Sequence, residues 1–142
     1  VRVDGMKGYH DAARHPEGRF VPGLVLFRWD EQLFFANADL FREAVLQAVA
    51  DAPTPTRQVI VAADAVNDID VTAADMLGEL DHELEARGID LQFAGLKGHV
   101  RDLIIRYGLS PRFDAEHFHP TVGNAVNVYR AQHDVKWKDW DE

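Results

Sequence analysis

The chain has 142 residues, of which 46% are hydrophobic and 27% are charged, a composition typical of one globular domain with a sizeable core. Its formal net charge of -9, without any Lys/Arg cluster, argues against nucleic acid and anionic membrane surfaces as partners. The chain contains no cysteine, which excludes disulfides and thiolate metal sites, and no stretch reaches the roughly 18 apolar residues that cross a bilayer.

The two ends of the chain differ from its middle. Residues 1–20 are polar and contain Gly and Pro without a sustained period, so they are predicted to form a linker-like N-terminal segment. Residues 21–132 are predicted to fold as the domain, and residues 133–142 to form a charged C-terminal tail. Because the chain begins at Val1 rather than Met, we expect it to be a segment of a longer or processed polypeptide.

From residue 21 onward, apolar strands alternate with amphipathic helices. Leu24–Trp29 and Leu33–Ala36 are predicted to pair as a hairpin, and Asn37 is a candidate N-cap for the helix that follows. The later predicted elements are a strand over 59–63, a helix to about 87, a strand over 89–94, a helix after 98 and a last helix around 122–129. This order predicts an α/β fold: a central mixed sheet of four to five strands that starts with the β-hairpin and is covered by about four helices.

The turn after the predicted strand 59–63 is rich in carboxylates. Asp68, Asp70 and Thr72 crowd the start of the next helix, where free N–H groups and a partial positive charge favour acidic and hydroxyl side chains. The pattern indicates a place for binding or switching. The alternative is a structural role, in which Asp70 and Thr72 cap the helix and Thr72 and Asp75 form a pair resembling a capping box.

A second candidate loop follows the predicted strand 89–94. Lys97, flanked by Gly95 and Gly98 ahead of a helix, has the charge and free backbone amides to hold a phosphate. The chain has neither a P-loop nor a Gly-x-Gly-x-x-Gly turn, so any nucleotide contact is expected to be weak. The alternative for Lys97 is a solvated residue in an ordinary loop.

Two groups of ionisable residues are candidate enzymatic sites: a metal pair of His117 and His119 beside Glu116, and an acid–base set of Asp81, His82 and Glu85. The first lacks a third ligand, and the second falls on the predicted solvent face of a helix. The only serine, Ser110, lies beyond a helix end without a nucleophile elbow. We therefore expect no catalysis, no metal site and no cofactor.

Four motifs together resemble the STAS domain that ends the SulP (sulfate permease) family of anion transporters: Val21–Trp29, Leu33–Ala38, Asp68–Ala73 and Gly95–Gly98. The likeness runs from about Tyr9 to Arg130. Gly8–Asp11 with Pro16 further resembles the segment that joins the last membrane helix of such transporters to this domain.

The resemblance implies a regulatory domain on the cytoplasmic face of the membrane, with the transmembrane transport domain of the same chain as its main partner. A second copy or another protein is a further expected partner. It also implies a weak guanine or adenine nucleotide contact at Asp68, Asp70, Thr72, Gly95 and Lys97. The transported anion stays open among sulfate, bicarbonate and dicarboxylates.

In stand-alone STAS proteins a phosphorylatable serine occupies the position that Thr72 takes here, so Thr72 and Asp70 are the expected regulatory positions. Val71 and Ala73 depart from that motif, because they replace a serine and a glycine. The alternative function is a stand-alone antagonist of an anti-sigma factor, switched by phosphorylation. The permease-like segment at Asn37 and the linker-like start argue against it. Ile105, Trp137 and Trp140 are further candidates for protein contacts.

Overall fold

The computed structural model describes residues 1, 2, 9, 12, 14–109, 113–133, 135 and 137. Within these residues no helix has both the length and the apolar character that crossing a membrane requires. The four strands are β1 (Leu24–Arg28), β2 (Gln58–Ala62), β3 (Asp90–Ala94) and β4 (Phe118–His119). The α-helices are α1 (Ala38–Asp51), α2 (Val71–Ala86), α3 (Gly98–Ile104) and α4 (Val122–Gln132). A π-helical turn, η1 (Ile105–Leu109), continues α3, and a 3₁₀ turn, η2 (Ala115–His117), precedes β4.

The strands form one parallel sheet in the order β1-β2-β3-β4. β2 lies at its centre and is buried along its whole length, because its residues Val59, Ile60 and Val61 are covered on both faces. Successive side chains of a strand point to opposite faces, so one apolar run contributes residues to a hydrophobic cluster on each face of the sheet. Val59 and Val61 belong to one hydrophobic cluster, and Ile60 belongs to the other.

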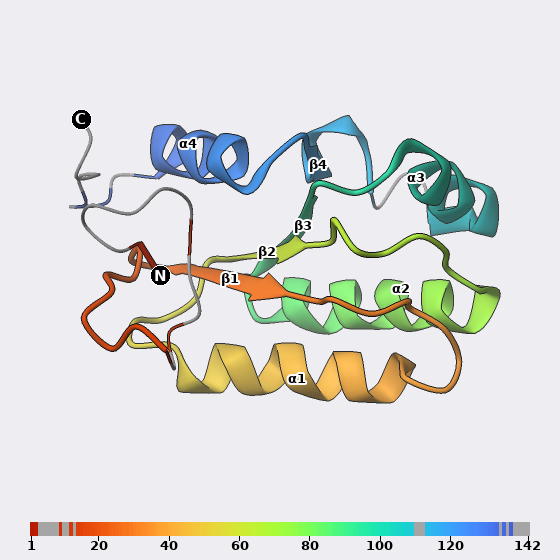
Figure 1. Ribbon diagram of the computed structural model, residues 1–142, viewed down its shortest axis with the longest axis horizontal. Helices are drawn as coiled ribbons and strands as arrows, with labels where there is room; N and C mark the ends of the chain where they lie inside the picture. The colour runs from red at the N-terminus through yellow and green to blue at the C-terminus, as the bar shows by residue number, and fades with distance from the viewer. Residues whose placement is uncertain are drawn as a thin grey trace.

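Helices cover both faces of the sheet (Figure 1). α1 and α2 pack together on one face, over the larger cluster, where Phe41, Leu77 and Leu80 are almost fully buried. α4 covers the other face, and its Tyr129 is fully buried with Val126 against Ile60. This is the three-layer α/β arrangement that the alternation of strands and helices predicts, and the predicted fold class is confirmed.

The predicted hairpin is wrong, and with it the mixed character of the sheet. Residues 33–36 do not pair with β1; Leu33 instead makes a single parallel bridge with Ile69. The side chain of Asn37 closes this segment into a turn, since its Oδ1 accepts from Phe34 N (3.0 Å) and its Nδ2 donates to Gln32 O (2.6 Å). Asn37 precedes α1 as predicted, but its side chain does not cap that helix.

The fourth strand was not predicted. Phe118 and His119 pair with Phe93 and Ala94, and two residues are too short a run to show a period of two. The parallel sheet is therefore completed by a strand that follows an irregular segment, which sequence patterns alone did not reveal.

The described part of the N-terminal segment lies on the domain. Arg2 forms an antiparallel bridge with Arg19, and its guanidinium lies over the ring of Tyr9. Trp137 of the C-terminal tail contacts two guanidinium groups: its ring centroid lies 5.2 Å from that of Arg19 and 5.0 Å from that of Arg130. Trp140 falls outside the described residues.

Candidate functional site

The carboxyl ends of β1, β2 and β3 lie at one edge of the sheet, and the loops that leave them carry the residues predicted to form a site (Figure 1). The β2–α2 turn supplies Asp68, Asp70 and Thr72, and the β3–α3 loop supplies Gly95 and Lys97. In open α/β sheets this edge is where ligands bind. The parallel register of the strands thus brings together residues that are nearly 30 positions apart in sequence.

Asp70 is the N-cap of α2 and also anchors the loop before α1. Its Oδ1 accepts from Ala73 N (2.8 Å), and its Oδ2 accepts from Phe35 N (2.8 Å). One carboxylate therefore satisfies the free N–H of a helix start and the N–H of a separate loop. This confirms the predicted capping role of Asp70.

Thr72 is the second residue of α2 and is exposed. The predicted capping by Thr72, with Asp75 as its partner, is wrong. Such a pair requires Thr72 to be the N-cap residue and α2 to begin at residue 73, whereas the N-cap is Asp70 and α2 begins at residue 71. The Thr72 hydroxyl group lies on the surface of the first turn, close in sequence to Asp70 and Asp75.

Gln32, from the loop after β1, holds the β2–α2 turn in place. Its Oε1 accepts from the backbone N–H groups of Asn67 (2.7 Å) and Asp68 (3.0 Å). Asp68 Oδ1 in turn accepts from the N–H of Ile69 (2.9 Å). Sequence reasoning missed Gln32, since its contacts lie 35 and 36 positions away along the chain.

The β3–α3 loop and the start of α3 contact the same β2–α2 turn. Lys97 Nζ donates to the side-chain oxygen of Asn67, and His99 Nε2 lies 2.5 Å from the Asn67 carbonyl oxygen. Gly95 has φ +73°, and a Cβ built there would lie 1.6 Å from Asp64 Oδ1. The glycine therefore permits both the left-handed backbone and the close approach of Asp64.

Residues 15–125 match the model of the STAS domain family. The chain belongs to the STAS domain family. It is 34% identical, over 128 residues, to "Probable sulfate transporter Rv1739c" of Mycobacterium tuberculosis; the match covers 90% of this chain and 23% of that protein. The chain thus spans about a quarter of the length of this relative.

Solved structures share the fold. Murine Solute Carrier 26 family member A9, an anion transporter, superposes with a TM-score of 0.81 at 19% identity, over 92% of this chain and 21% of the transporter. The SulP transporter STAS domain of Vibrio cholerae superposes with a TM-score of 0.64 at 19% identity, over 84% of this chain and 91% of that structure.

Several of the groups that could hold a phosphate in this STAS domain are already engaged. Side-chain oxygens accept from the N–H groups of residues 67, 68, 69 and 73, and Lys97 bonds to Asn67. An anion would have to displace these partners and would meet the carboxylates of Asp64, Asp68 and Asp70. The β2–α2 turn is therefore held by its own side-chain hydrogen bonds and has an acidic surface.

The two histidines of the candidate metal pair have separate partners. The ring nitrogens of His117 face Asp114 Oδ1 (2.8 Å) and Asp90 Oδ1 (3.3 Å), whereas His119 Nε2 donates to Gln92 Oε1 (2.6 Å). Among the described residues, no group of three His, Asp or Glu side chains is placed to hold a metal ion.

Two side chains near these histidine contacts, the carboxyl of Asp114 and the imidazole of His119, have shifted pKa values. The hydrogen bond from His117 lowers the pKa of the exposed Asp114 carboxyl below its ordinary value of 3.8. Burial lowers the pKa of His119 below 6.5, and the nearby His117 adds to this effect. Its surroundings therefore favour the neutral form of the His119 ring over the charged form.

The acid–base set on α2 does not lie on one solvent face as predicted. Asp81 is buried, with 6% of its surface exposed, whereas His82 and Glu85 are exposed. The three side chains therefore belong to different environments.

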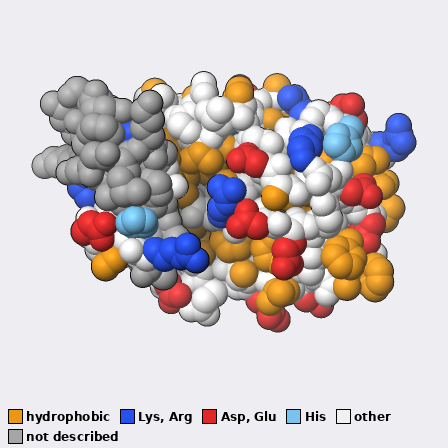
Figure 2. All heavy atoms as spheres, viewed as in Figure 1, with side chains coloured by type: hydrophobic (Ala, Val, Ile, Leu, Met, Phe, Trp, Pro, Cys, Tyr) orange, Lys and Arg blue, Asp and Glu red, His pale blue; other side chains and the backbone are white. Residues whose placement is uncertain are grey.

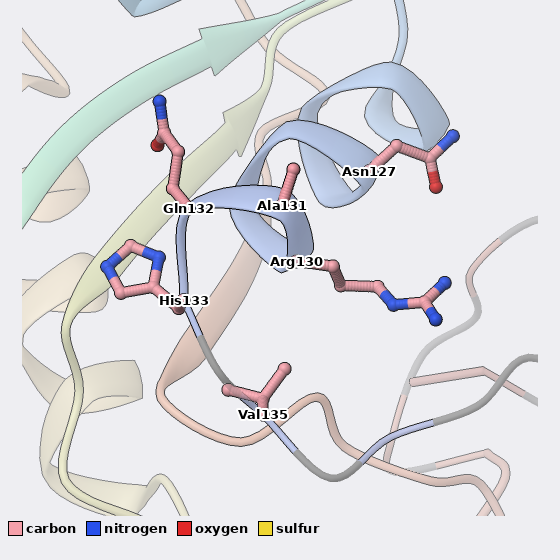
Figure 3. A pocket seen from close by; sticks show the side chains of 6 residues that line it. All are labelled: Asn127, Arg130, Ala131, Gln132, His133 and Val135. Atoms are coloured by element: carbon pink, nitrogen blue, oxygen red, sulfur yellow. The ribbon is translucent and has the colours of Figure 1, made fainter.

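A hollow of about 600 Å³ lies at the C-terminal end of α4, away from the carboxyl edge (Figure 3). Asn127 and Arg130 lie on one side of the helix end, and His133 and Gln132 lie on the other. The predicted site residues do not line this hollow. Ile105, a predicted contact residue, is 44% exposed on the π-helical turn after α3.

Proposed function

We propose that this chain is the regulatory STAS domain of a SulP-type anion transporter, on the cytoplasmic face of the membrane and joined in one polypeptide to a transmembrane transport unit. The observation that carries the proposal is the 34% identity to a sulfate transporter over 90% of this chain. The same observation favours this function over that of a stand-alone anti-sigma factor antagonist. The proposed substrate class is sulfate and related small anions.

The domain acts by binding with different strength to different states of the transport unit. A domain outside the membrane shifts a transport equilibrium only through such a difference in binding free energy. The acidic edge of the sheet carries exposed groups for such contacts, whereas the sheet itself is covered on both faces.

The test is anion uptake by the full reading frame that contains this chain. Membrane vesicles carrying the intact protein are expected to take up labelled sulfate, bicarbonate or a dicarboxylate, and removal of residues 21–132 is expected to change the rate without preventing membrane insertion. Quantified protein in the vesicles is the control. A reading frame without hydrophobic spans, or uptake of none of the three anions, would overturn the proposal.

We propose further that a nucleotide modulates the domain at Lys97, next to Asp68, Asp70, Thr72 and Gly95. Binding would require Lys97 to leave Asn67, so its affinity is weak. Amide NMR titrations with GDP, GTP, ATP and sulfate should show shifts in residues 67–75 and 95–100. Lys97→Ala should abolish these shifts, and Asn67→Ala should strengthen them because it releases Lys97. Absence of shifts in both the unmodified chain and Asn67→Ala contradicts a nucleotide role.

Thr72 is the proposed regulatory position for modification. Its exposed hydroxyl group is accessible to a kinase, and a phosphate there would add negative charge beside Asp70 and Asp75. Thr72→Glu is expected to change the uptake rate of the intact transporter, whereas Thr72→Val should not. Equal rates for both variants and the unmodified protein would remove Thr72 from the regulatory mechanism.

A further inference from the structure

Four of the large hydrophobic side chains that are exposed in the described part of the chain gather where α1 and α2 begin. Phe35 is 71% exposed, Leu40 58%, Val71 53% and Phe34 40%. The rings of Phe34 and Phe35 meet edge to face, with centroids 5.8 Å apart, and Val71 follows Asp70, which binds the backbone of Phe35. Figure 2 shows hydrophobic side chains gathered at this end of the molecule. We call these four residues the edge patch.

The edge patch is held by an ordered backbone. Phe34 N donates to Asn37 Oδ1 and Phe35 N donates to Asp70 Oδ2, so both aromatic residues are fixed in a hydrogen-bonded turn. An aromatic ring left in water gains free energy when a partner buries its apolar surface. Exposed apolar side chains gathered at one end of a domain are a feature of interaction sites, and a preordered surface loses little conformational freedom when it binds.

The surroundings of the edge patch are acidic. Residues 29–41 and 64–79 contain no Lys, Arg or His, and their acidic residues are Asp30, Glu31, Asp39, Asp64, Asp68, Asp70, Asp75 and Glu79. Arg28 pairs with Asp30, and Lys97 approaches from the neighbouring loop, where it is bonded to Asn67. Most of this negative charge therefore faces solvent, and a complementary partner carries Lys or Arg around an apolar centre.

The negative charge around the edge patch favours some binding partners over others. A second copy docked through the same surface would bring two acidic rims together, and a membrane surface of anionic lipids would be repelled. Cytoplasmic loops of membrane proteins, by contrast, carry an excess of Lys and Arg. Resting on the function proposed above, we propose that the edge patch docks a Lys/Arg-rich cytoplasmic loop of the transport unit, whose apolar side chains cover Phe34 and Phe35.

The proposal is tested by site-specific photo-cross-linking in membranes that contain the full-length protein. p-Benzoylphenylalanine replaces Phe35, which keeps an exposed aromatic ring at this position. As a matched control it replaces Val128, which is 38% exposed on α4, on the other face of the sheet. The expected product joins residue 35 to a Lys/Arg-rich cytoplasmic loop, as mapped by mass spectrometry, and is absent for residue 128.

Charge reversal supplies a second readout. The double variant Glu31→Lys with Asp75→Lys should lower the residue-35 cross-link at least fivefold, and so should raising the salt concentration to 0.5 M, because both weaken the attraction. The control variant, Glu85→Lys, changes an exposed carboxylate at the far end of α2 and should leave the yield unchanged.

The outcomes separate this inference from the proposed function. A cross-link to a second copy, to lipid or to nothing, in vesicles that still transport anions, overturns the docking proposal and leaves the transporter assignment standing. Failure of anion uptake by the intact reading frame overturns the proposed function instead. A residue-35 cross-link to an acidic or uncharged loop, unaffected by salt, also contradicts the proposed role of the acidic rim.

Discussion

Asp70 and Phe35 are joined by a hydrogen bond of 2.8 Å between the Phe35 N–H and Asp70 Oδ2, although they lie 35 positions apart. The other oxygen of the same carboxylate caps α2 through Ala73 N. The start of α2 and the turn before α1 therefore share one side chain, and this sharing fixes how the edge patch is presented.

The first prediction is that Asp70→Ala lowers the free energy of unfolding by about 1–2 kcal/mol, as for the loss of an N-cap. Asp70→Asn should lose less, since its amide oxygen still accepts one of the two hydrogen bonds. Urea unfolding measures both variants, and hydrogen exchange at the Phe35 amide should become faster in Asp70→Ala. Thr72→Ala is the matched control and should stay within about 0.5 kcal/mol. An equal loss in Thr72→Ala would show that Thr72 shares the capping role.

The second prediction concerns Gly95. Its φ of +73° costs an alanine about 1–2 kcal/mol, and the new Cβ would also displace Asp64. Gly95→Ala should therefore destabilise the chain more than Gly88→Ala, since Gly88 has the same φ of +73° but nothing within 4 Å of the added atom. Thermal or urea unfolding compares the two variants.

A double variant and a control separate the two costs at Gly95. Adding Asp64→Ala to Gly95→Ala should bring its loss down to that of Gly88→Ala. Gly98→Ala should be close to neutral, since Gly98 has no neighbour within 4 Å and no positive φ. Equal losses at positions 95 and 88 would mean that Asp64 moves aside without cost.

The sequence predicted the buried strands and the helices well, because each carried a long and regular signal. Val59–Ala63 is an uninterrupted apolar run, and α2 repeats apolar residues at helical spacing up to Gly88. The segment 33–36 failed because its apolar residues satisfy the pattern of a strand, whereas Asn37 and Gln32 satisfy its backbone as a turn. A local sequence pattern does not show whether a backbone segment will pair with a neighbouring strand or bond to nearby side chains.

The candidate site was predicted in part for the same reason. Asp70 could be placed because a cap is a local feature, but its second bond to Phe35 and the contacts of Gln32 with the turn join segments about 35 positions apart. The pattern of charged and apolar residues also predicted Asp81 on the solvent face of α2, whereas Asp81 is buried. Only the parallel register of the sheet shows that these segments meet.

The third prediction is a pH dependence of stability through His119. Burial lowers its pKa in the folded chain below 6.5, so between that folded-state pKa and 6.5 the unfolded chain binds more protons. The contribution of His119 to the free energy of unfolding is therefore fully present above pH 6.5. It is lost as the pH falls from 6.5 toward the folded-state pKa. Urea unfolding at pH 7.5 and pH 5.5 measures this loss.

His119→Gln should reduce that pH dependence, since glutamine does not titrate and its amide can still donate to Gln92. His82→Gln, at an exposed position of α2, is the control and should keep the full dependence. An unchanged loss between pH 7.5 and pH 5.5 in His119→Gln would assign the effect to other groups.

The fourth prediction is that Trp137 fastens the N-terminal segment to α4. Its ring contacts the guanidinium groups of both Arg19 and Arg130, and such cation–π contacts are worth about 0.5–2 kcal/mol each. Trp137→Ala should therefore loosen the bridge between Arg2 and Arg19, whose backbone hydrogen bonds are 3.0 and 2.8 Å long. Hydrogen exchange at these two amides should become faster, while the amides of β2 keep their protection.

Trp137→Phe separates the ring contact from a general loss of packing. Phenylalanine retains a smaller aromatic face, so exchange at Arg2 and Arg19 should lie between that of the unmodified chain and that of Trp137→Ala. Val128→Ala, on the exposed side of α4, should leave both amides unchanged. If both amides exchange at the original rate in Trp137→Ala, the N-terminal segment is held by its own bridge and by the contacts of Tyr9 with the second hydrophobic cluster. Faster exchange would instead mean that the C-terminal tail sets the path by which the segment before residue 20 reaches the domain.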